Sequence, residues 1–226
     1  MKKLMTVVVM LCMVLGMGSM AFAQTGNVSA DLWFTSHTWQ EDTDADSKKH
    51  EASGMLTGVK GEFDITNKIG VVGSAVFGKT DDFETIPKNR GELTNLNLAV
   101  QYQVIPMVKA QAGFFTGGYN MTDDVTDREF KTSGLTIGAA VDFEVGDGIS
   151  LFGEANYAPI VNAKEGDDEY KASTMMAFEA GGKYDFGQFA VKAGYRYQGF
   201  DFKEKDANTS TAATFSGFFV GGGVRF

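Results

Sequence analysis

The segment Phe215-Ser-Gly-Phe-Phe-Val-Gly-Gly-Gly-Val-Arg-Phe226 alternates in character from residue to residue. Successive side chains of a strand point to opposite faces, so one face carries Phe218, Val220, Val224 and Phe226. The other face carries Phe219, Gly221, Gly223 and Arg225. Chain ends usually fray, but the last strand of a barrel in lipid must pair, because hydrocarbon excludes an unpaired strand edge. The segment therefore predicts a strand that closes a β-barrel in the bacterial outer membrane.

The beginning of the chain has the pattern of an export signal. Lys2 and Lys3 precede the apolar stretch 4–16, and Ala21-Phe22-Ala23 supplies a small-x-small cleavage pattern. We predict a signal peptide over residues 1–23 and a mature domain over residues 24–226. The stretch is shorter than the ~20 residues of a spanning helix, which argues against a membrane anchor. Cys12 is the only cysteine and would leave with the signal, so thiol chemistry is excluded from the mature chain.

The composition narrows the class of protein. Without Lys2 and Lys3 the formal net charge falls from −9 to −11, and such an acidic chain is not expected to bind nucleic acid. No apolar run after residue 23 is long enough for a membrane helix. Apolar residues alternate with a period of two almost everywhere, whereas a helix would need a period near 3.6. We expect one all-β domain.

The alternating runs predict ten strands, with eight as the alternative. Their ranges are 27–39, 53–65, 69–79, 93–104, 108–119, 134–145, 149–160, 173–186, 189–200 and the segment 215–226. The third run is ambiguous in phase because Val71 and Val72 are adjacent. Ser74 decides the phase and places Val71, Ala75 and Phe77 on the outer face.

Short and long connections alternate between these runs. Tight turns are predicted at 66–68, 105–107, 146–148 and 187–188, and longer polar loops near 40–52, 80–92, 119–133, 161–172 and 201–212. This alternation is typical of transmembrane barrels and argues against a soluble β-sandwich or a lipocalin-like barrel. An even strand number would place both termini at the periplasmic side and all five long loops outside the cell.

A family resemblance follows from these features. Phe226, with Val224 two residues before it and Gly221 five residues before it, resembles the C-terminal signal that the barrel-assembly machinery reads. Phe219 departs from that signal, where a polar residue is common. In architecture the mature chain resembles the small outer-membrane β-barrel proteins: the OmpA membrane domain, the OmpX and OmpW-like group, and the adhesin Opc. The resemblance implies an antiparallel up-and-down barrel that is a monomer and contacts outer-membrane lipid and lipopolysaccharide.

The polar faces of the strands would converge inside the barrel. We expect a lumen network of Asp31, Lys60, Glu62, Asp142, Glu154, Glu179, Lys183, Lys192, Arg196 and Arg225. The same faces add Asp64, Glu144, Asp185 and Lys109, so that acids and bases nearly balance. Mixed charges in a narrow barrel favour a salt-bridged plug, because an unpaired buried charge is costly. Ten strands are too few for a wide pore, and a narrow conducting path is the alternative to an occluded lumen.

Catalytic and metal sites are not expected. His37, at the end of its strand, and His50, in the first loop, are the only histidines, and each is interpreted as a solvated surface residue without a catalytic partner. Asp42, Asp44 and Asp46 resemble the first three ligand positions of an EF-hand, but Ser47 and Ser53 replace its glycine and its bidentate glutamate. We therefore predict no enzyme, no cofactor and no dedicated metal site.

The acidic outer loops suggest contact with lipopolysaccharide through bridging divalent cations. The residues expected to touch phosphate directly are Lys48, Lys49, Lys88, Arg90 and Lys203. Two functions remain open from the sequence. The first is an envelope-structural or narrow porin-like role for small solutes, and the alternative is a surface adhesin or receptor that acts through the acidic loops.

Overall fold

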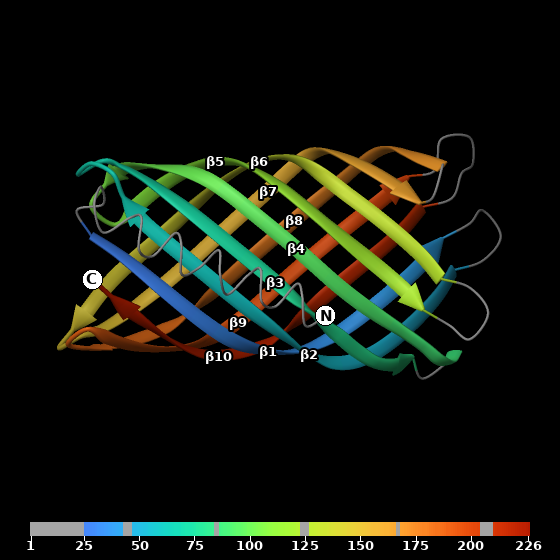
Figure 1. Cartoon of the computed structure of the whole chain (residues 1–226), viewed down its shortest axis with the longest axis horizontal. Helices are drawn as coiled ribbons and strands as arrows, with labels where there is room; N and C mark the ends of the chain where they lie inside the picture. Colours follow the sequence, from blue (N-terminus) through green and yellow to red (C-terminus); the bar gives the residue numbers. More distant parts are fainter. Residues whose placement is uncertain (1–24, 43–46, 84–85, 123–126, 166–167, 204–209) are drawn as a thin grey trace.

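A computed structural model describes residues 25–42, 47–83, 86–122, 127–165, 168–203 and 210–226. It contains ten strands: β1 (Thr25–Asp42), β2 (Ser47–Asp64), β3 (Ile69–Phe83), β4 (Ile86–Ile105), β5 (Val108–Thr122), β6 (Asp127–Gly146), β7 (Ile149–Glu165), β8 (Asp168–Phe186), β9 (Phe189–Lys203) and β10 (Ser210–Arg225). Each strand pairs with its neighbours in the chain and β1 pairs with β10, which closes the barrel (Figure 1). The predicted ten-stranded antiparallel barrel is confirmed, and the eight-stranded alternative is wrong.

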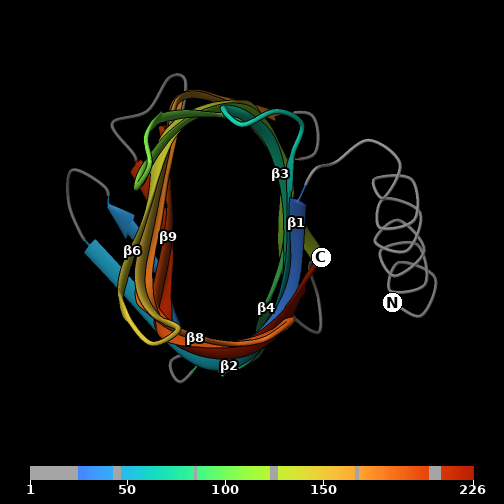
Figure 2. The same ribbon diagram turned by 90° about the vertical axis from the view of Figure 1, so that its left-hand side faces the viewer.

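The seam between the first and last strands is continuous. The register of β1 with β10 runs from Asn27 opposite Arg225 to Asp42 opposite Ser210 without a shift. Seen along the barrel axis, the wall is a closed oval ring (Figure 2). Closure leaves none of the ten described strands with an unpaired edge, which is the condition for a sheet to stand in lipid.

The two ends of the barrel differ in their connections. Four tight turns join strands at one end, hereafter the turn end, and Asp147 in one of them has a positive φ of 48°. The other end, hereafter the loop end, carries the remaining connections (Figure 1). Most of the predicted long loops are in fact strand, because β2 already begins at Ser47 and β6 at Asp127. The prediction of these loops was wrong: beyond the lipid the outer face becomes polar, so the apolar alternation stops while the backbone ladder continues.

The barrel is apolar on its outside. Leu98, Ile137 and Phe218 point outward and are 61%, 60% and 71% exposed. The Val72 side chain points into the barrel and is buried. This agrees with the prediction that its alternate neighbours on β3 point outward. A spanning strand needs only about 9–11 residues, whereas these strands have 15 to 20, so the barrel extends beyond its apolar belt. Among the described residues, no helix is long and apolar enough to cross a membrane.

Candidate functional site

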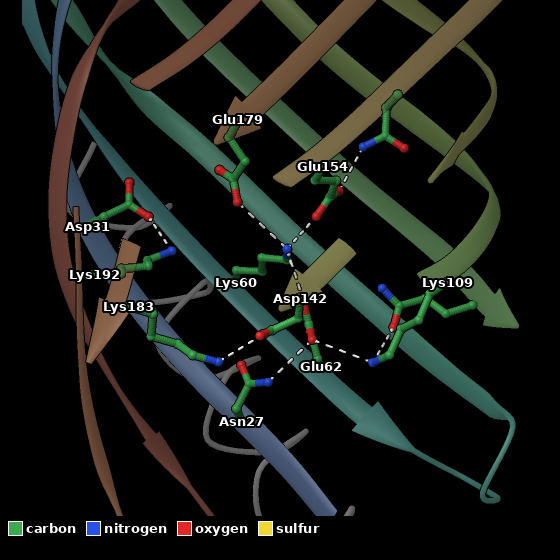
Figure 3. A network of polar contacts seen from close by, with 12 residues as sticks. Asn27, Asp31, Lys60, Glu62, Lys109, Asp142, Glu154, Glu179, Lys183 and Lys192 are labelled. Atoms are coloured by element: carbon green, nitrogen blue, oxygen red, sulfur yellow. Dashed lines mark hydrogen bonds and ion pairs between the residues drawn. The ribbon is translucent and has the colours of Figure 1, made fainter. Parts of the chain in front are cut away.

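The interior at mid-height holds seven charged side chains, hereafter the central ion-pair cluster. They are Asp31 of β1, Lys60 and Glu62 of β2, Glu154 of β7, Glu179 of β8, and Lys192 and Arg196 of β9. Each occupies the inward phase of its strand, opposite the apolar residues that face outward. The polar phase of five strands therefore meets inside the closed wall, as Figure 3 shows for most of these residues.

Arg196 connects two carboxylates at the centre of the cluster. Its Nη1 and Nη2 donate to Oδ1 and Oδ2 of Asp31 at 2.9 and 3.1 Å, and its Nε donates to Oε2 of Glu179 at 2.9 Å. Lys192 adds an ion pair to Asp31 at 3.0 Å, and the Asp31 side chain is only 1% exposed. Gly58 makes room for this arrangement, because a Cβ there would lie 2.9 Å from Arg196 Nη1. These charges are buried but paired.

The Lys60 ammonium group interacts with three carboxylates. Its Nζ donates to Glu154 Oε2 and forms ion pairs with Glu62 Oε1 at 3.0 Å and Glu179 Oε1 at 3.8 Å (Figure 3). The other Glu154 oxygen accepts a hydrogen bond of 2.7 Å from Nδ2 of Asn156. The cluster is thus one connected network that crosses the lumen from β2 to β7 and β8.

The remaining predicted lumen residues lie apart from this cluster, at the turn-end rim. Lys183 pairs with Asp142 at 2.9 Å, and Arg225 pairs with Asp185 at 3.2 Å. The side chains of Asp142 and Arg225 are 55% and 54% exposed. The structure therefore brings seven of the ten predicted residues together, and it places Asp142, Lys183 and Arg225 in peripheral pairs.

An aromatic cluster, which the sequence analysis missed, fills the lumen between the ion pairs and the loop end. It consists of Trp33, Trp39, Phe83, Phe115, Tyr119, Phe130, Phe200, Phe202, Phe215 and Phe219, none more than 3% exposed. Leu56, Leu93, Val161 and Met175 complete the packing, so that all ten strands contribute a buried apolar side chain. The sequence feature that could have predicted this cluster is an aromatic residue at a position where the strand alternation places polar, inward-facing side chains, as at Trp33 and Phe219.

Phe219 joins the two clusters. The Arg196 guanidinium lies 4.8 Å and the Lys192 ammonium 5.4 Å from the centre of its ring. Cations are attracted to aromatic faces at such distances. The aromatic residue that departs from the assembly signal is therefore an inward side chain that covers buried cations.

The two histidines are not the solvated surface residues that the sequence suggested. His37 is fully buried and its ring stacks on Phe215, with the ring centres 4.3 Å apart. Neither of its ring nitrogens has a hydrogen-bond partner among the described residues. His50 lies in β2 rather than in a loop, with its ring edge toward Phe83 at 6.3 Å. The interpretation failed because both residues lie where strands continue past the lipid.

Two cavities lie on either side of the central ion-pair cluster. A vestibule of about 160 Å³ lies at the turn end, where Pro106 and Met107 of a tight turn line it. An inner chamber of about 90 Å³ lies toward the aromatic cluster and reaches Phe115. Lys60, Glu154 and Glu179 line both cavities, so these side chains form the partition between them.

The residues of the predicted assembly signal lie along the seam. Phe226 exchanges two backbone hydrogen bonds with Gly26, at 2.8 and 3.0 Å. Val224 faces outward, and Gly221 lies opposite Asp31 of β1. Recognition of these residues by the assembly machinery stays a prediction.

The weak metal candidates do not form a site in the described part of the chain. Asp42 ends β1, whereas Asp44 and Asp46 lie outside the described residues. No group of three or more His, Cys, Asp or Glu side chains that could hold a metal ion occurs among the described residues. The Asp42 carboxylate instead accepts hydrogen bonds from Ser47 at 2.5 Å and from Gln40 at 3.0 Å.

These hydrogen bonds lead to a prediction for the Asp42 carboxyl, which lies beyond the apolar belt. The bond from Ser47, followed by that from Gln40, holds the pKa of Asp42 below its ordinary value, because both stabilise the charged form. We expect Ser47→Ala to raise the pKa of Asp42 toward that value, in a pH titration of the carboxyl carbon by NMR. An unchanged pKa would contradict the assigned hydrogen bond.

Comparison with known proteins gives one family and a set of similar folds. The family described as "Outer membrane protein beta-barrel domain" matches residues 9–176. The outer membrane protease OmpT from Escherichia coli is similar with a TM-score of 0.58 and 10% identity, over 90% of this chain and 97% of that chain. At this identity the likeness is one of fold alone. No curated protein matches the chain.

Two further solved structures have lower scores. The translocator domain of the autotransporter NalP from Neisseria meningitidis has a TM-score of 0.45 and 13% identity, over 98% of both chains. The attachment invasion locus protein Ail of Yersinia pestis has a TM-score of 0.31 and 16% identity, over 89% of this chain and 99% of that chain. The family match alone places the chain among outer-membrane β-barrel domains.

Proposed function

The chain belongs to the outer membrane protein beta-barrel domain family, and from this premise we propose that it is an envelope-structural barrel with a closed lumen. In this proposal the barrel stands in the outer membrane, carries no solute and catalyses no reaction. The observation that carries the proposal is the presence of two closures in series, the central ion-pair cluster and the aromatic cluster.

Both closures are costly to open. The ion-paired side chains of Asp31, Lys192 and Arg196 are 1%, 10% and 11% exposed, so separating them would leave charges buried without partners. The aromatic cluster would lose close ring contacts such as that of Trp39 with Tyr119, whose centres are 5.3 Å apart. A permeation path needs a continuous thread of water. The packing supports a closed barrel over the narrow porin-like alternative.

The proposal predicts that the barrel does not admit small sugars. Liposomes that contain the refolded mature chain are expected to swell in arabinose no faster than liposomes without protein, because both closures block the lumen. A general porin in the same lipid is the positive control, since sixteen-stranded barrels leave an aqueous channel. Swelling that rises with the amount of barrel protein would contradict the proposal.

A second role, surface contact with lipopolysaccharide, is favoured by the outer face of the loop end. Lys49, Lys79 and Lys131 are outward residues beyond the apolar belt, with side chains 57%, 44% and 71% exposed. Exposed ammonium groups are suited to phosphate. Of these three lysines only Lys49 was a predicted phosphate contact. Among the remaining predicted contacts, Lys48 and Arg90 are also exposed, whereas the side chains of Lys88 and Lys203 lie outside the described set.

This role predicts that replacing Lys49, Lys79 and Lys131 together by Ala weakens retention of lipopolysaccharide by the purified barrel by about tenfold. A matched control replaces their acidic ion-pair partners, Glu51, Glu92 and Glu129. That control should retain more lipopolysaccharide, because it removes repulsion and frees the lysines. Equal retention by the two triple variants, measured by phosphate analysis after gel filtration, would rule out direct contact.

A further inference from the structure

The central ion-pair cluster contains one more acid than base. Asp31 and Glu179 both bind Arg196, and Lys192 forms a second ion pair with Asp31. Glu154 has Lys60 as its only cationic contact among the described residues, and it shares that ammonium with Glu62 and Glu179. Four carboxylates thus face three cations in the buried cluster, with Glu154 the least compensated.

The charges at the turn-end rim do not remove this excess. Lys109 lies 4.0 Å from Glu62 but also 3.9 Å from Asp64, so it is shared with a second carboxylate. Lys183 and Arg225 face Asp142 and Asp185. An uncompensated buried charge is costly, and a bound cation would neutralise it.

The inner chamber offers oxygen atoms next to this charge. Asn95, Asn97 and Asn156 line the chamber, and the side-chain oxygen of each is buried without a hydrogen-bond donor among the described residues. Asn156 also donates to Glu154, which links the amide oxygens to the surplus carboxylate. Gln198, 4% exposed, lines the same chamber and has an unpartnered amide nitrogen. Buried polar atoms without partners are rare and point to bound water or an ion.

We propose that the inner chamber binds one small monovalent cation of the alkali or ammonium class. Glu154 supplies the negative charge, and Asn95, Asn97 and Asn156 supply neutral oxygens, directly or through water that also satisfies Gln198. Carbonyl and carboxylate oxygens are the ligands of hard cations. A single surplus charge matches a monovalent ion, and a volume of about 90 Å³ exceeds the ~15 Å³ that one water needs.

The cation would enter from the turn end and stay. Lys60, Glu154 and Glu179 line both the chamber and the vestibule and lie between them, whereas the aromatic cluster lies on the other side of the chamber. The ion is therefore a resident of the chamber rather than a permeating solute, and this part of the inference rests on the closed lumen of the proposed function, whereas the binding of the ion does not.

The test uses rubidium as the probe. Equilibrium dialysis of the refolded mature chain against radioactive rubidium chloride is expected to show one saturable site per barrel, which potassium displaces. Crystals grown in rubidium chloride should show an anomalous peak in the inner chamber. Glu154→Gln is expected to weaken rubidium binding by at least about tenfold, because it removes the surplus charge.

The matched control is Asp142→Asn, which removes a carboxylate from the exposed rim and should leave rubidium affinity within about twofold. If Glu154→Gln does not fold, Asn97→Leu is the second variant and should also weaken binding. The absence of saturable rubidium binding by the unmodified chain at neutral and mildly alkaline pH would overturn the proposal. That result would mean that the chamber holds water alone.

Discussion

Arg196→Ala is expected to lower the free energy of unfolding of the barrel by about 3–5 kcal/mol. The guanidinium donates to both oxygens of Asp31 and to Glu179, and the Asp31 side chain is only 1% exposed. Without Arg196 these two carboxylates would remain in the lumen with too few cations. The measurement is urea unfolding of the refolded barrel in micelles, followed by tryptophan fluorescence and by heat-modifiable migration on a gel.

Arg90→Ala is the control for this prediction. Arg90 Nε donates to Asp82 Oδ1 at 2.6 Å, but its side chain is 63% exposed. Exposed ion pairs contribute only about 0–1 kcal/mol, so this variant should unfold at nearly the same urea concentration as the unmodified chain. Arg196→Lys keeps the charge but loses the planar fork and should be intermediate. A loss for Arg196→Ala no larger than that for Arg90→Ala would contradict the assigned role.

Phe215→Ala is expected to cost about 3–5 kcal/mol. Phe215 is fully buried, its ring stacks on His37 at 4.3 Å, and its centre lies 5.8 Å from that of Tyr119. Truncation would leave a cavity within the aromatic cluster, because ten paired strands cannot move inward to fill it. The same urea titration measures the effect.

Phe218→Ala provides a control on the same strand. Phe218 faces outward and is 71% exposed to the lipid side. Lipid or detergent chains can occupy the space that its ring leaves, so no cavity forms, and we expect less than about half of the loss at Phe215. Equal losses for the two variants would show that the lumen is not packed like a protein core.

The sequence was sufficient to predict the barrel but not the height of its wall. Within the hydrocarbon region, lipid requires apolar side chains at every outward position, and this produces the period of two that is visible at Leu96, Leu98 and Val100. Beyond the lipid, outward residues such as Ser36 and Ser53 are polar. The alternation then disappears although the backbone hydrogen bonds continue, so strand ends cannot be located from hydropathy.

The same limit applies to the charged residues of the lumen. Strand phase predicted that Lys60, Glu154 and Arg196 point inward, and in the structure they do. Phase alone could not separate them from Asp142 and Arg225, which lie at the rim. The position of a side chain along the barrel axis depends on the tilt and stagger of the strands. Tilt and stagger are properties of the whole barrel.

The aromatic cluster could not be recognised in the sequence, because its residues are adjacent to outward-facing apolar residues. In the pair Phe114-Phe115 one ring faces outward with 49% exposure and the other is fully buried. Trp33 lies between two outward-facing apolar residues, so the hydropathy pattern alone would assign it to the apolar belt. His37 became buried only through contacts with β3, β5 and β10, which no local pattern reveals.

Single-channel recording in a planar bilayer tests the closed lumen most directly. The refolded mature chain, shown to be inserted by its heat-modifiable migration, should give no discrete openings at moderate voltage. A general porin in the same bilayer should conduct, since its wider barrel holds an aqueous channel. Discrete openings of the unmodified barrel, with an ion selectivity that changes in Glu154→Gln, would contradict the account and restore the porin-like alternative.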